Sequence, residues 1–281
     1  MNQKRRLSIG LPNFGNTCYI NSVLQVLRYQ KPLVYMLRDF HTNPHTNDKT
    51  EQLLGSFVEL LYADADVREL HLLIRNLSQV SSQFRLLRQC DSHELYLFLV
   101  DSFFEKHKDL QNPFKGTLGS TITCQECGNT SITTTPFISL SLEMRQSDTP
   151  LKVSEMIEDF KMLEVLEDQI QCDACNTKRP CTKQLHIEKS PKLLVLHLKR
   201  FIGLSKNSDP IFIEKEIIVN KKKYRLSSLC NHTGSSTGGH YTATCLRKDA
   251  MWVVCNDSKI SKIEDIPRVT NVPYICFYES I

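Results

Sequence analysis

The chain has 281 residues, which is enough for one large domain or two of ordinary size. A composition of 41% hydrophobic and 23% charged residues is ordinary for a globular protein and supplies ample material for a core. The formal net charge of +4 is too small to indicate nucleic-acid or membrane binding by itself, and we expect neither.

The N-terminus carries no targeting or membrane-spanning signal. Residues 1–8 are expected to form a tail, and no apolar run approaches the roughly 18–20 residues needed to span a bilayer. We therefore expect a cytoplasmic or nuclear location, or both. The eleven cysteines, in a reducing compartment, favour metal binding or catalysis over a disulfide framework.

The predicted elements change character along the chain. Apolar residues at helical spacing predict helices within residues 20–27, 53–61 and 91–104. From residue 114 onward, Thr, Ile, Ser and Phe alternate in a way that favours strands, interrupted by a helical pattern over 151–167. A buried strand is predicted over 192–202, and further short strands follow it. A helical third before a strand-rich remainder predicts an α+β fold.

One cysteine stands at the start of the first predicted helix, in the stretch GNTCYINSVLQVL (15–27). A thiol at a helix N-terminus faces the positive end of the helix dipole, so we expect a lowered pKa for Cys18 and a nucleophilic thiolate. The alternative is a small buried side chain at a helix start.

A cysteine nucleophile needs a base, and the base needs a group that orients it. His240 lies in the Gly- and Ser-rich stretch GSSTGGHY, which runs straight into a predicted strand. Asn256 and Asp257 follow a later short strand, so a strand–turn–strand path returns a side-chain oxygen to the imidazole. We expect that oxygen to accept the Nδ1 proton and to hold Nε2 toward the thiol. His232 is the alternative base.

Two C-x-x-C pairs predict a metal site. They are Cys124 with Cys127, and Cys172 with Cys175, separated by 44 residues. Four thiolates in two such turns are typical of one structural Cys₄ zinc ion, which leaves no open position for catalysis. A redox dithiol is the alternative, and the neighbouring Cys181 is a competing ligand. We expect no catalytic metal and no organic cofactor.

Four segments together resemble the ubiquitin-specific proteases, which are papain-like deubiquitinases with a finger–palm–thumb fold. GLPNFGNTCYINSVLQVL resembles the family's cysteine box, and GGHYTATCLRKDAMWVVCNDSKI its histidine box. QCDSHEL and LLVLHLKRF resemble two motifs between them. The resemblance implies one catalytic domain over residues 9–281, with a thumb of about 9–113, zinc-bearing fingers of about 114–185 and a palm of about 186–281.

The resemblance also implies roles by position. Cys18 matches the nucleophile, His240 the general base and Asn256 the orienting residue, while Asp257 shares an orienting or water-positioning role. Asn13 matches the oxyanion-hole side chain, and donation from it and from the Cys18 backbone N–H to a developing oxyanion makes physical sense. The alternatives are a turn residue for Asn13 and a surface carboxylate for Asp257.

The implied substrate is ubiquitin, cleaved after its C-terminal Gly-Gly through an acyl-enzyme thioester. Gln89 and Asp91 match the family's motif that receives the arginine-rich tail, and Gly238, Gly239 and Tyr241 are expected beside it. Asp91 is alternatively a helix N-cap, and Tyr241 alternatively a strand-core residue. We expect a monomer whose partners are ubiquitin and ubiquitinated proteins. The alternative functions are an inactive ubiquitin-binding scaffold and a protease for a ubiquitin-like modifier.

Overall fold

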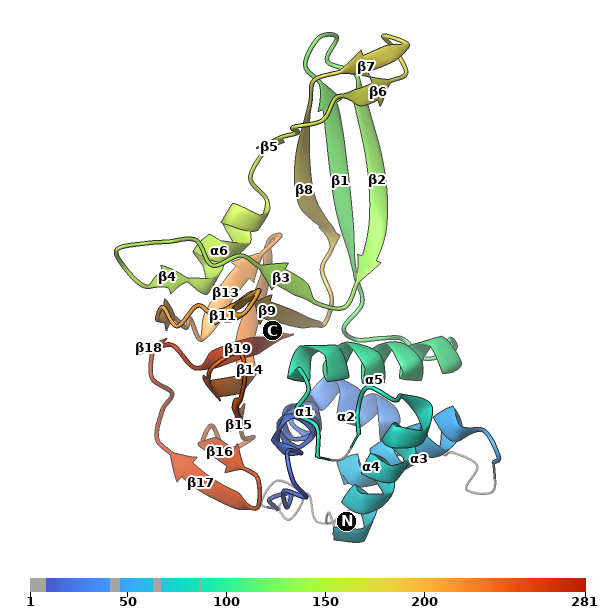
Figure 1. Cartoon of the computed structure of the whole chain (residues 1–281), viewed down its shortest axis with the longest axis vertical. Helices are drawn as coiled ribbons and strands as arrows, with labels where there is room; N and C mark the ends of the chain where they lie inside the picture. The colour runs from blue at the N-terminus through green and yellow to red at the C-terminus, as the bar shows by residue number, and fades with distance from the viewer. Residues whose placement is uncertain (1–8, 41–45, 63–66, 86) are drawn as a thin grey trace.

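The computed structural model describes residues 9–40, 46–62, 67–85 and 87–281. The expected tail, residues 1–8, therefore lies outside the described residues. Helices come first along the chain and strands follow, as the α+β prediction requires. Figure 1 shows a helical lobe beside a sheet, with a narrow strand lobe projecting away from both.

The helical lobe, which we call the thumb, contains five α-helices and one short 3₁₀-helix among the described residues. They are α1 (Cys18–Arg28), α2 (Lys31–Met36), η2 (Leu37–Asp39), α3 (Lys49–Tyr62), α4 (Val67–Val80) and α5 (Ser92–Lys106). The three predicted helices are α1, α3 and α5. The first third was expected to be largely helical, but no bounds were predicted for α2 and α4. Every residue of α1 is buried, because this helix lies between the other helices and the palm.

An eight-stranded sheet forms the palm. Its strand order is β17-β16-β15-β14-β19-β9-β3, and β13 pairs with β14 beside this path. The bounds are β3 (Leu140–Leu142), β9 (Leu193–Leu198), β13 (Glu216–Val219), β14 (Lys222–Gly234), β15 (Gly239–Leu246), β16 (Trp252–Asn256), β17 (Lys259–Ile263) and β19 (Pro273–Ser280).

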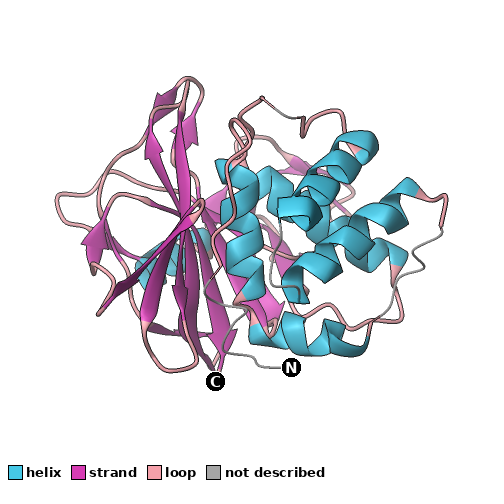
Figure 2. Ribbon diagram, turned by 90° about the horizontal axis from the view of Figure 1, so that it is seen from below, coloured by secondary structure: helices cyan, strands magenta, loops and turns pink. Residues whose placement is uncertain are grey.

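The central palm strands β9 and β19 are buried on both faces, which explains their nearly continuous apolar sequences. Because side chains alternate along a strand, Ile275 and Phe277 of β19 pack toward the thumb, whereas Cys276 and Tyr278 pack on the opposite face. Figure 2 shows the helices gathered along one side of the strands. The thumb therefore covers the sheet face on which β15 meets α1.

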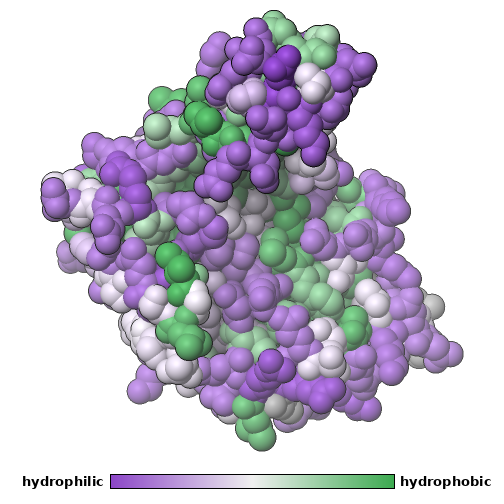
Figure 3. Space-filling model, turned by 45° about the horizontal axis from the view of Figure 1, so that its top comes forward, coloured by the Kyte–Doolittle hydropathy of each residue, from purple (hydrophilic) through white to green (hydrophobic). Residues whose placement is uncertain are grey.

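The projecting lobe is a four-stranded sheet in the order β2-β1-β8-β5, and a separate β6-β7 hairpin lies at its tip (Figure 1). The bounds are β1 (Gly116–Cys124), β2 (Thr130–Phe137), β5 (Glu164–Val165), β6 (Ile170–Cys172), β7 (Thr177–Arg179) and β8 (Cys181–Lys189). We call these strands the fingers. The face seen in Figure 3 is hollowed beneath this lobe, with apolar surface among polar side chains.

Part of the segment expected to form fingers lies with the palm instead. β3 joins the palm sheet, and α6 (Val153–Phe160) packs on its outer face through Val153, Met156 and Ile157. This helix is shorter than the predicted 151–167, because β5 begins at Glu164. The remaining short strands are β4 (Leu151–Lys152), β10 (Phe201–Ile202), β11 (Ser205–Lys206), β12 (Ile211–Phe212) and β18 (Val269–Thr270). No described helix has the length and apolar character needed to cross a membrane.

Candidate active site and candidate metal centre

Cys18 is the first residue of α1, and two residues in the left-handed region precede it. Gly15 has φ +86° and Asn16 has φ 60°, which turns the chain sharply into the helix. The Cys18 side chain is buried, at 2% exposure. Backbone N–H groups of Cys18 and Tyr19 lower its pKa, but burial outweighs them and raises it above the ordinary value. The expectation of a lowered pKa from the helix N-terminus is therefore wrong for this structure, because desolvation is the larger effect.

The packing of α1 on the palm brings the start of β15, which carries His240, beside Cys18. Strand β15 begins at Gly239 and lies against α1. A backbone hydrogen bond from Tyr241, the residue that follows His240, lowers the Cys18 pKa. The sulfur thus lies within hydrogen-bond reach of the main chain at the residue after His240. Along the chain, 221 residues lie between Cys18 and His240.

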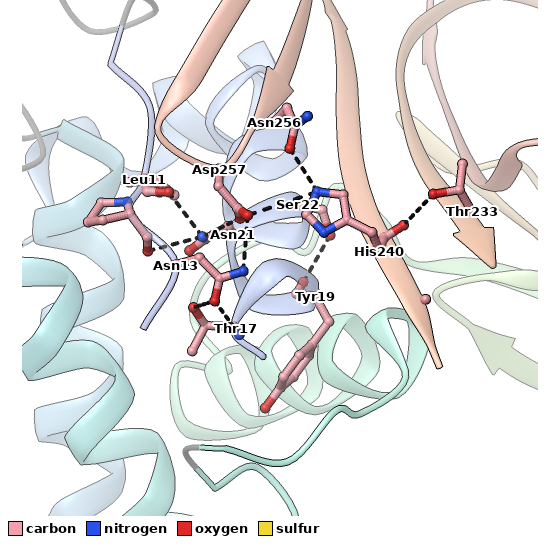
Figure 4. A network of polar contacts seen from close by, with 12 residues as sticks. Leu11, Asn13, Thr17, Tyr19, Asn21, Ser22, Thr233, His240, Asn256 and Asp257 are labelled. Atoms are coloured by element: carbon pink, nitrogen blue, oxygen red, sulfur yellow. Dashed lines mark hydrogen bonds and ion pairs between the residues drawn. The ribbon is translucent and has the colours of Figure 1, made fainter. Parts of the chain in front are cut away.

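Asn256 ends β16, the strand beside β15, and its side chain orients the histidine. Its Oδ1 lies 2.7 Å from Nε2 of His240 (Figure 4). An amide oxygen can only accept, so Nε2 carries the proton and Nδ1 keeps a lone pair. The expectation that Nδ1 donates to the orienting residue and Nε2 faces the thiol is wrong. In the structure Nε2 is the nitrogen that faces Asn256, the last residue of β16.

Asp257 occupies the two-residue turn between β16 and β17, with φ 49°. Its carboxylate lies 3.9 Å from His240 Nε2, which is too far for a hydrogen bond. One carboxylate oxygen accepts from Asn13 at 3.0 Å and the other from Asn21 at 2.8 Å. Its carbonyl oxygen accepts from the Leu11 N–H at 2.9 Å. Asp257 therefore joins the segment before Cys18 to the palm.

Asn13 lies in the turn before α1, and its amide is held at both ends. Its Oδ1 accepts from the N–H groups of Gly15 and Thr17, at 3.0 and 3.1 Å, and from the Thr17 hydroxyl at 3.3 Å. Its Nδ2 donates one hydrogen to Asp257. An amide nitrogen carries two hydrogens, so one remains for another acceptor. This arrangement combines the turn role with a donor in front of the cysteine.

Gln89 and Asp91 precede α5, and both are engaged within the chain. Gln89 Nε2 donates to the Gly239 carbonyl at 2.6 Å, and the Gly239 N–H donates back to Oε1 at 3.3 Å. Asp91 is the N-cap of α5, as the alternative interpretation predicted, and Oδ1 accepts from the His93 and Glu94 N–H groups. The Tyr274 hydroxyl donates to its other oxygen.

His232, the alternative base, and Tyr241, which was expected beside the substrate tail, are both buried beside the site. His232 has a pKa lowered to about 4, first by burial and then by Lys206, whose Nζ contacts Nδ1 at 2.9 Å. Such a histidine stays neutral and packs against Phe201 and Tyr241. Tyr241 is 7% exposed, so its position is that of a strand-core residue.

Sequence reasoning missed two residues of this network. Asn21 is a buried amide on the wholly buried helix α1, three residues after Cys18, and a polar residue one turn after the candidate nucleophile was the available signal. Tyr274 of β19 reaches Asp91 from the far end of the chain. No local pattern marks a tyrosine of an apolar strand as a partner of a residue 183 positions away.

The four C-x-x-C cysteines meet at the finger tip. Their sulfur atoms all lie within 4.8 Å of one another, and the Sγ atoms of Cys127 and Cys172 are 3.6 Å apart. Tetrahedral Zn–S bonds of about 2.3 Å place sulfurs about 3.8 Å apart, so the donor set fits a metal. Backbone N–H groups of Cys127 and Glu126 help lower the Cys124 pKa to about 7. Cys181 is outside the set, and its thiol donates to the Arg179 carbonyl.

The chain is similar to known proteins over nearly its whole length. The family model for ubiquitin carboxyl-terminal hydrolase matches residues 9–278. Identity is 30% to ubiquitin carboxyl-terminal hydrolase Usp2 of Drosophila melanogaster, over 96% of this chain and 34% of that protein. It is 31% to ubiquitin carboxyl-terminal hydrolase 21 of Arabidopsis thaliana, over 96% of this chain and 41% of that protein. The chain thus spans less than half the length of these two relatives.

Solved structures show the same fold. One is the SAGA Ubp8/Sgf11/Sus1/Sgf73 DUB module bound to ubiquitin aldehyde, with a TM-score of 0.85 and 26% identity over 100% of this chain and 71% of that chain. Another is a Ubp8 variant in the same module bound to monoubiquitin, with a TM-score of 0.87 and 25% identity over the same shares. By sequence and by fold, this chain belongs to the ubiquitin carboxyl-terminal hydrolase family.

Proposed function

We propose that this chain hydrolyses isopeptide and peptide bonds at the C-terminal glycine of ubiquitin. The observation that carries the proposal is the 2.7 Å contact between His240 Nε2 and Asn256 Oδ1, beside a Cys18 sulfur held at β15. That contact supports a proton on Nε2 of His240. It leaves the Nδ1 lone pair free to take the thiol proton.

The chemistry follows from these positions. His240 Nδ1 removes the Cys18 proton, and the thiolate attacks the carbonyl carbon of the terminal glycine. The free N–H of Asn13 and the Cys18 backbone N–H stabilise the oxyanion, each such donor contributing about 10²–10³ in rate. The protonated imidazole then gives its proton to the departing amine, and water hydrolyses the thioester with His240 again as base.

The raised pKa of Cys18 makes His240 necessary. Burial keeps the resting thiol protonated, so the thiolate forms only as the proton moves to the imidazole. Asn256 supports that transfer because its oxygen stabilises the imidazolium that results. We assign Asp257 to Asn13 rather than to His240, on the distances of 3.0 and 3.9 Å.

The substrate tail is proposed to lie along the start of β15. Gln89 and Gly239, which are joined by two hydrogen bonds, would form one wall of the groove for the tail. Gly238, Tyr241 and the Asp91 carboxylate would lie beside that wall. Two glycines at the end of ubiquitin suit a narrow passage whose walls are main chain. The hollow beneath the fingers in Figure 3 is a surface on which the folded part of ubiquitin would rest.

The metal at the finger tip is proposed to be Zn²⁺, because a four-thiolate donor set favours this ion. Its contribution would be structural, since four protein ligands leave no position for substrate. It would tie the end of β1 to the β6-β7 hairpin across an exposed lobe with little apolar core of its own.

Ubiquitin carrying a C-terminal electrophile tests the function. We expect covalent capture by the wild-type chain and none by Cys18→Ala, while Cys90→Ala, which removes another thiol on the thumb, keeps it. Turnover of a ubiquitin–fluorophore conjugate should follow the same pattern. Capture only by a probe built on a ubiquitin-like modifier would transfer the activity to that substrate. Binding of ubiquitin without any capture would identify an inactive scaffold.

A further inference from the structure

Asn21 is one of several buried polar side chains of α1, together with Ser22, Gln25 and Arg28. It lies one turn after Cys18 and is 2% exposed. Its Nδ2 faces three oxygen acceptors, namely the Leu11 carbonyl at 3.0 Å, the Pro12 carbonyl at 3.2 Å and Asp257 Oδ1 at 2.8 Å (Figure 4). A single NH₂ group thus joins α1, the segment before it and the turn after β16.

The orientation of this amide is determined by its surroundings. Turning it over would place Oδ1 against the same three oxygens, which is repulsive. In the observed orientation, Oδ1 of Asn21 is buried with no hydrogen-bond partner among the described residues. An apolar side chain at this position would leave the Leu11 and Pro12 carbonyls and Asp257 Oδ1 without this donor, so the amide does more than fill space.

The bond to Asp257 continues to the residue proposed to hold the oxyanion. Asp257 Oδ1 accepts from Asn21, and Oδ2 accepts from Asn13 Nδ2 at 3.0 Å. The carboxylate is thereby held between two amides and kept 3.9 Å from His240 Nε2. Without Asn21, one oxygen loses its donor, and a rotation of the carboxylate toward the imidazole would take it away from Asn13.

We propose that Asn21 is a positioning residue that locks the Asp257 carboxylate on Asn13 and away from His240. This inference rests on the proposed function. Asparagine suits the position because its NH₂ supplies hydrogens to the carboxylate and the two carbonyls. Aspartate would present a second carboxylate to Asp257, and alanine would supply no donor.

Asn21→Ala and a matched control on the same helix test the inference. The control is Gln25→Ala, which removes a buried amide that donates to the Ile9 carbonyl at 2.9 Å rather than to Asp257. With ubiquitin–fluorophore turnover, we expect Asn21→Ala to lower kcat about 10–100-fold with little change in KM, since an oxyanion donor is misplaced. Gln25→Ala should keep kcat at temperatures where it is folded.

Two further measurements separate positioning from a merely structural role. An Asp257 carboxylate released toward His240 favours the imidazolium, so the acidic limb of the kcat/KM profile should move to higher pH in Asn21→Ala and not in Gln25→Ala. Asn21→Ala and Asn13→Ala should also be non-additive, because both act through one donor. If Asn21→Ala does not fold, Asn21→Leu keeps the branched shape with larger terminal groups, removes the amide and serves in its place.

The outcomes distinguish this inference from the proposed function. A wild-type chain that neither captures nor turns over ubiquitin refutes the function. A wild-type chain that is active, with Asn21→Ala equal to Gln25→Ala in kcat and pH profile, refutes the positioning role alone. Additive effects of Asn21→Ala and Asn13→Ala would likewise overturn it.

Discussion

Nε2 of His240 and Oδ1 of Asn256 lie 2.7 Å apart at the ends of neighbouring strands. The Asp257 carboxylate lies 3.9 Å from the same nitrogen, so Asn256, and not the aspartate that follows it, is hydrogen-bonded to the imidazole. A neutral amide therefore holds the histidine, and the nearby carboxylate is engaged by two other amides.

Removal of Asn256 should slow catalysis with little effect on folding. Asn256→Ala frees the imidazole, so we expect turnover of a ubiquitin–fluorophore conjugate to fall about 10²-fold or more. Alkylation of Cys18 by iodoacetamide at neutral pH should slow as well, because the base that takes its proton is misaligned.

Asp257→Ala is the informative comparison for that variant. It should also reduce turnover, because Asn13 loses its partner, but it should leave Cys18 alkylation close to that of the wild type. Equal alkylation defects in the two variants would show that Asp257 orients His240 after all.

Adjacent glycines before His240 should respond very differently to alanine. A Cβ at Gly239 would lie 2.3 Å from both His232 Nε2 and the Thr233 carbonyl oxygen, whereas a Cβ at Gly238 meets only Gln89 Oε1 at 3.8 Å. We expect Gly239→Ala to lower the free energy of unfolding by about 1–3 kcal/mol, the usual cost of overpacking. Gly238→Ala should leave the free energy of unfolding unchanged. Chemical denaturation of the two variants and the wild type measures the difference. Equal losses would mean that the strand start is more pliant than the distances indicate.

Loss of one metal ligand should remove the metal and loosen the fingers. We expect Cys124→Ser to lose zinc in elemental analysis and to unfold at a lower temperature, because binding free energy at a structural site is folding free energy. Cys181→Ser changes the neighbouring buried thiol that lies outside the donor set, and it should retain the metal. A metal-free Cys124→Ser chain as stable as the wild type would refute a structural role.

Two stacked histidines should make the fold sensitive to acid. His93 of α5 and His197 of β9 have ring centroids 3.9 Å apart, and burial lowers their pKa values to about 3 and about 4. An unfolded histidine has a pKa near 6.5, so below that pH the unfolded chain binds more protons and stability falls as pH falls. From pH 6.5 to 5, each histidine should cost about 2 kcal/mol.

Denaturant titrations at several pH values check this expectation. His197→Asn should flatten the dependence of unfolding free energy on pH between 5 and 6.5. His186→Asn, which removes a histidine from the exposed finger strand β8, controls for loss of an imidazole. A slope unchanged by His197→Asn would mean that this histidine is not held neutral in the folded chain.

The sequence by itself determined the fold class, the family and the residue types of the site. Helical spacing in the first third and alternation after residue 114 are local patterns, so they can be recognised without knowing which other segments of the chain pack against them. The metal site could also be predicted from local sequence, because the two thiolates of one C-x-x-C turn already make half of a tetrahedral site.

Only the tertiary structure decided which site residues contact one another. Asn256 and Asp257 are neighbours in sequence, and which one faces His240 depends on where β16 ends and its turn begins. The ring nitrogen that faces Asn256, the net rise of the Cys18 pKa and the bond from Asn21 to Asp257 all depend on α1 packing against β15. Burial and hydrogen-bond geometry are properties of segments brought together from distant parts of the chain, so local sequence patterns do not contain them.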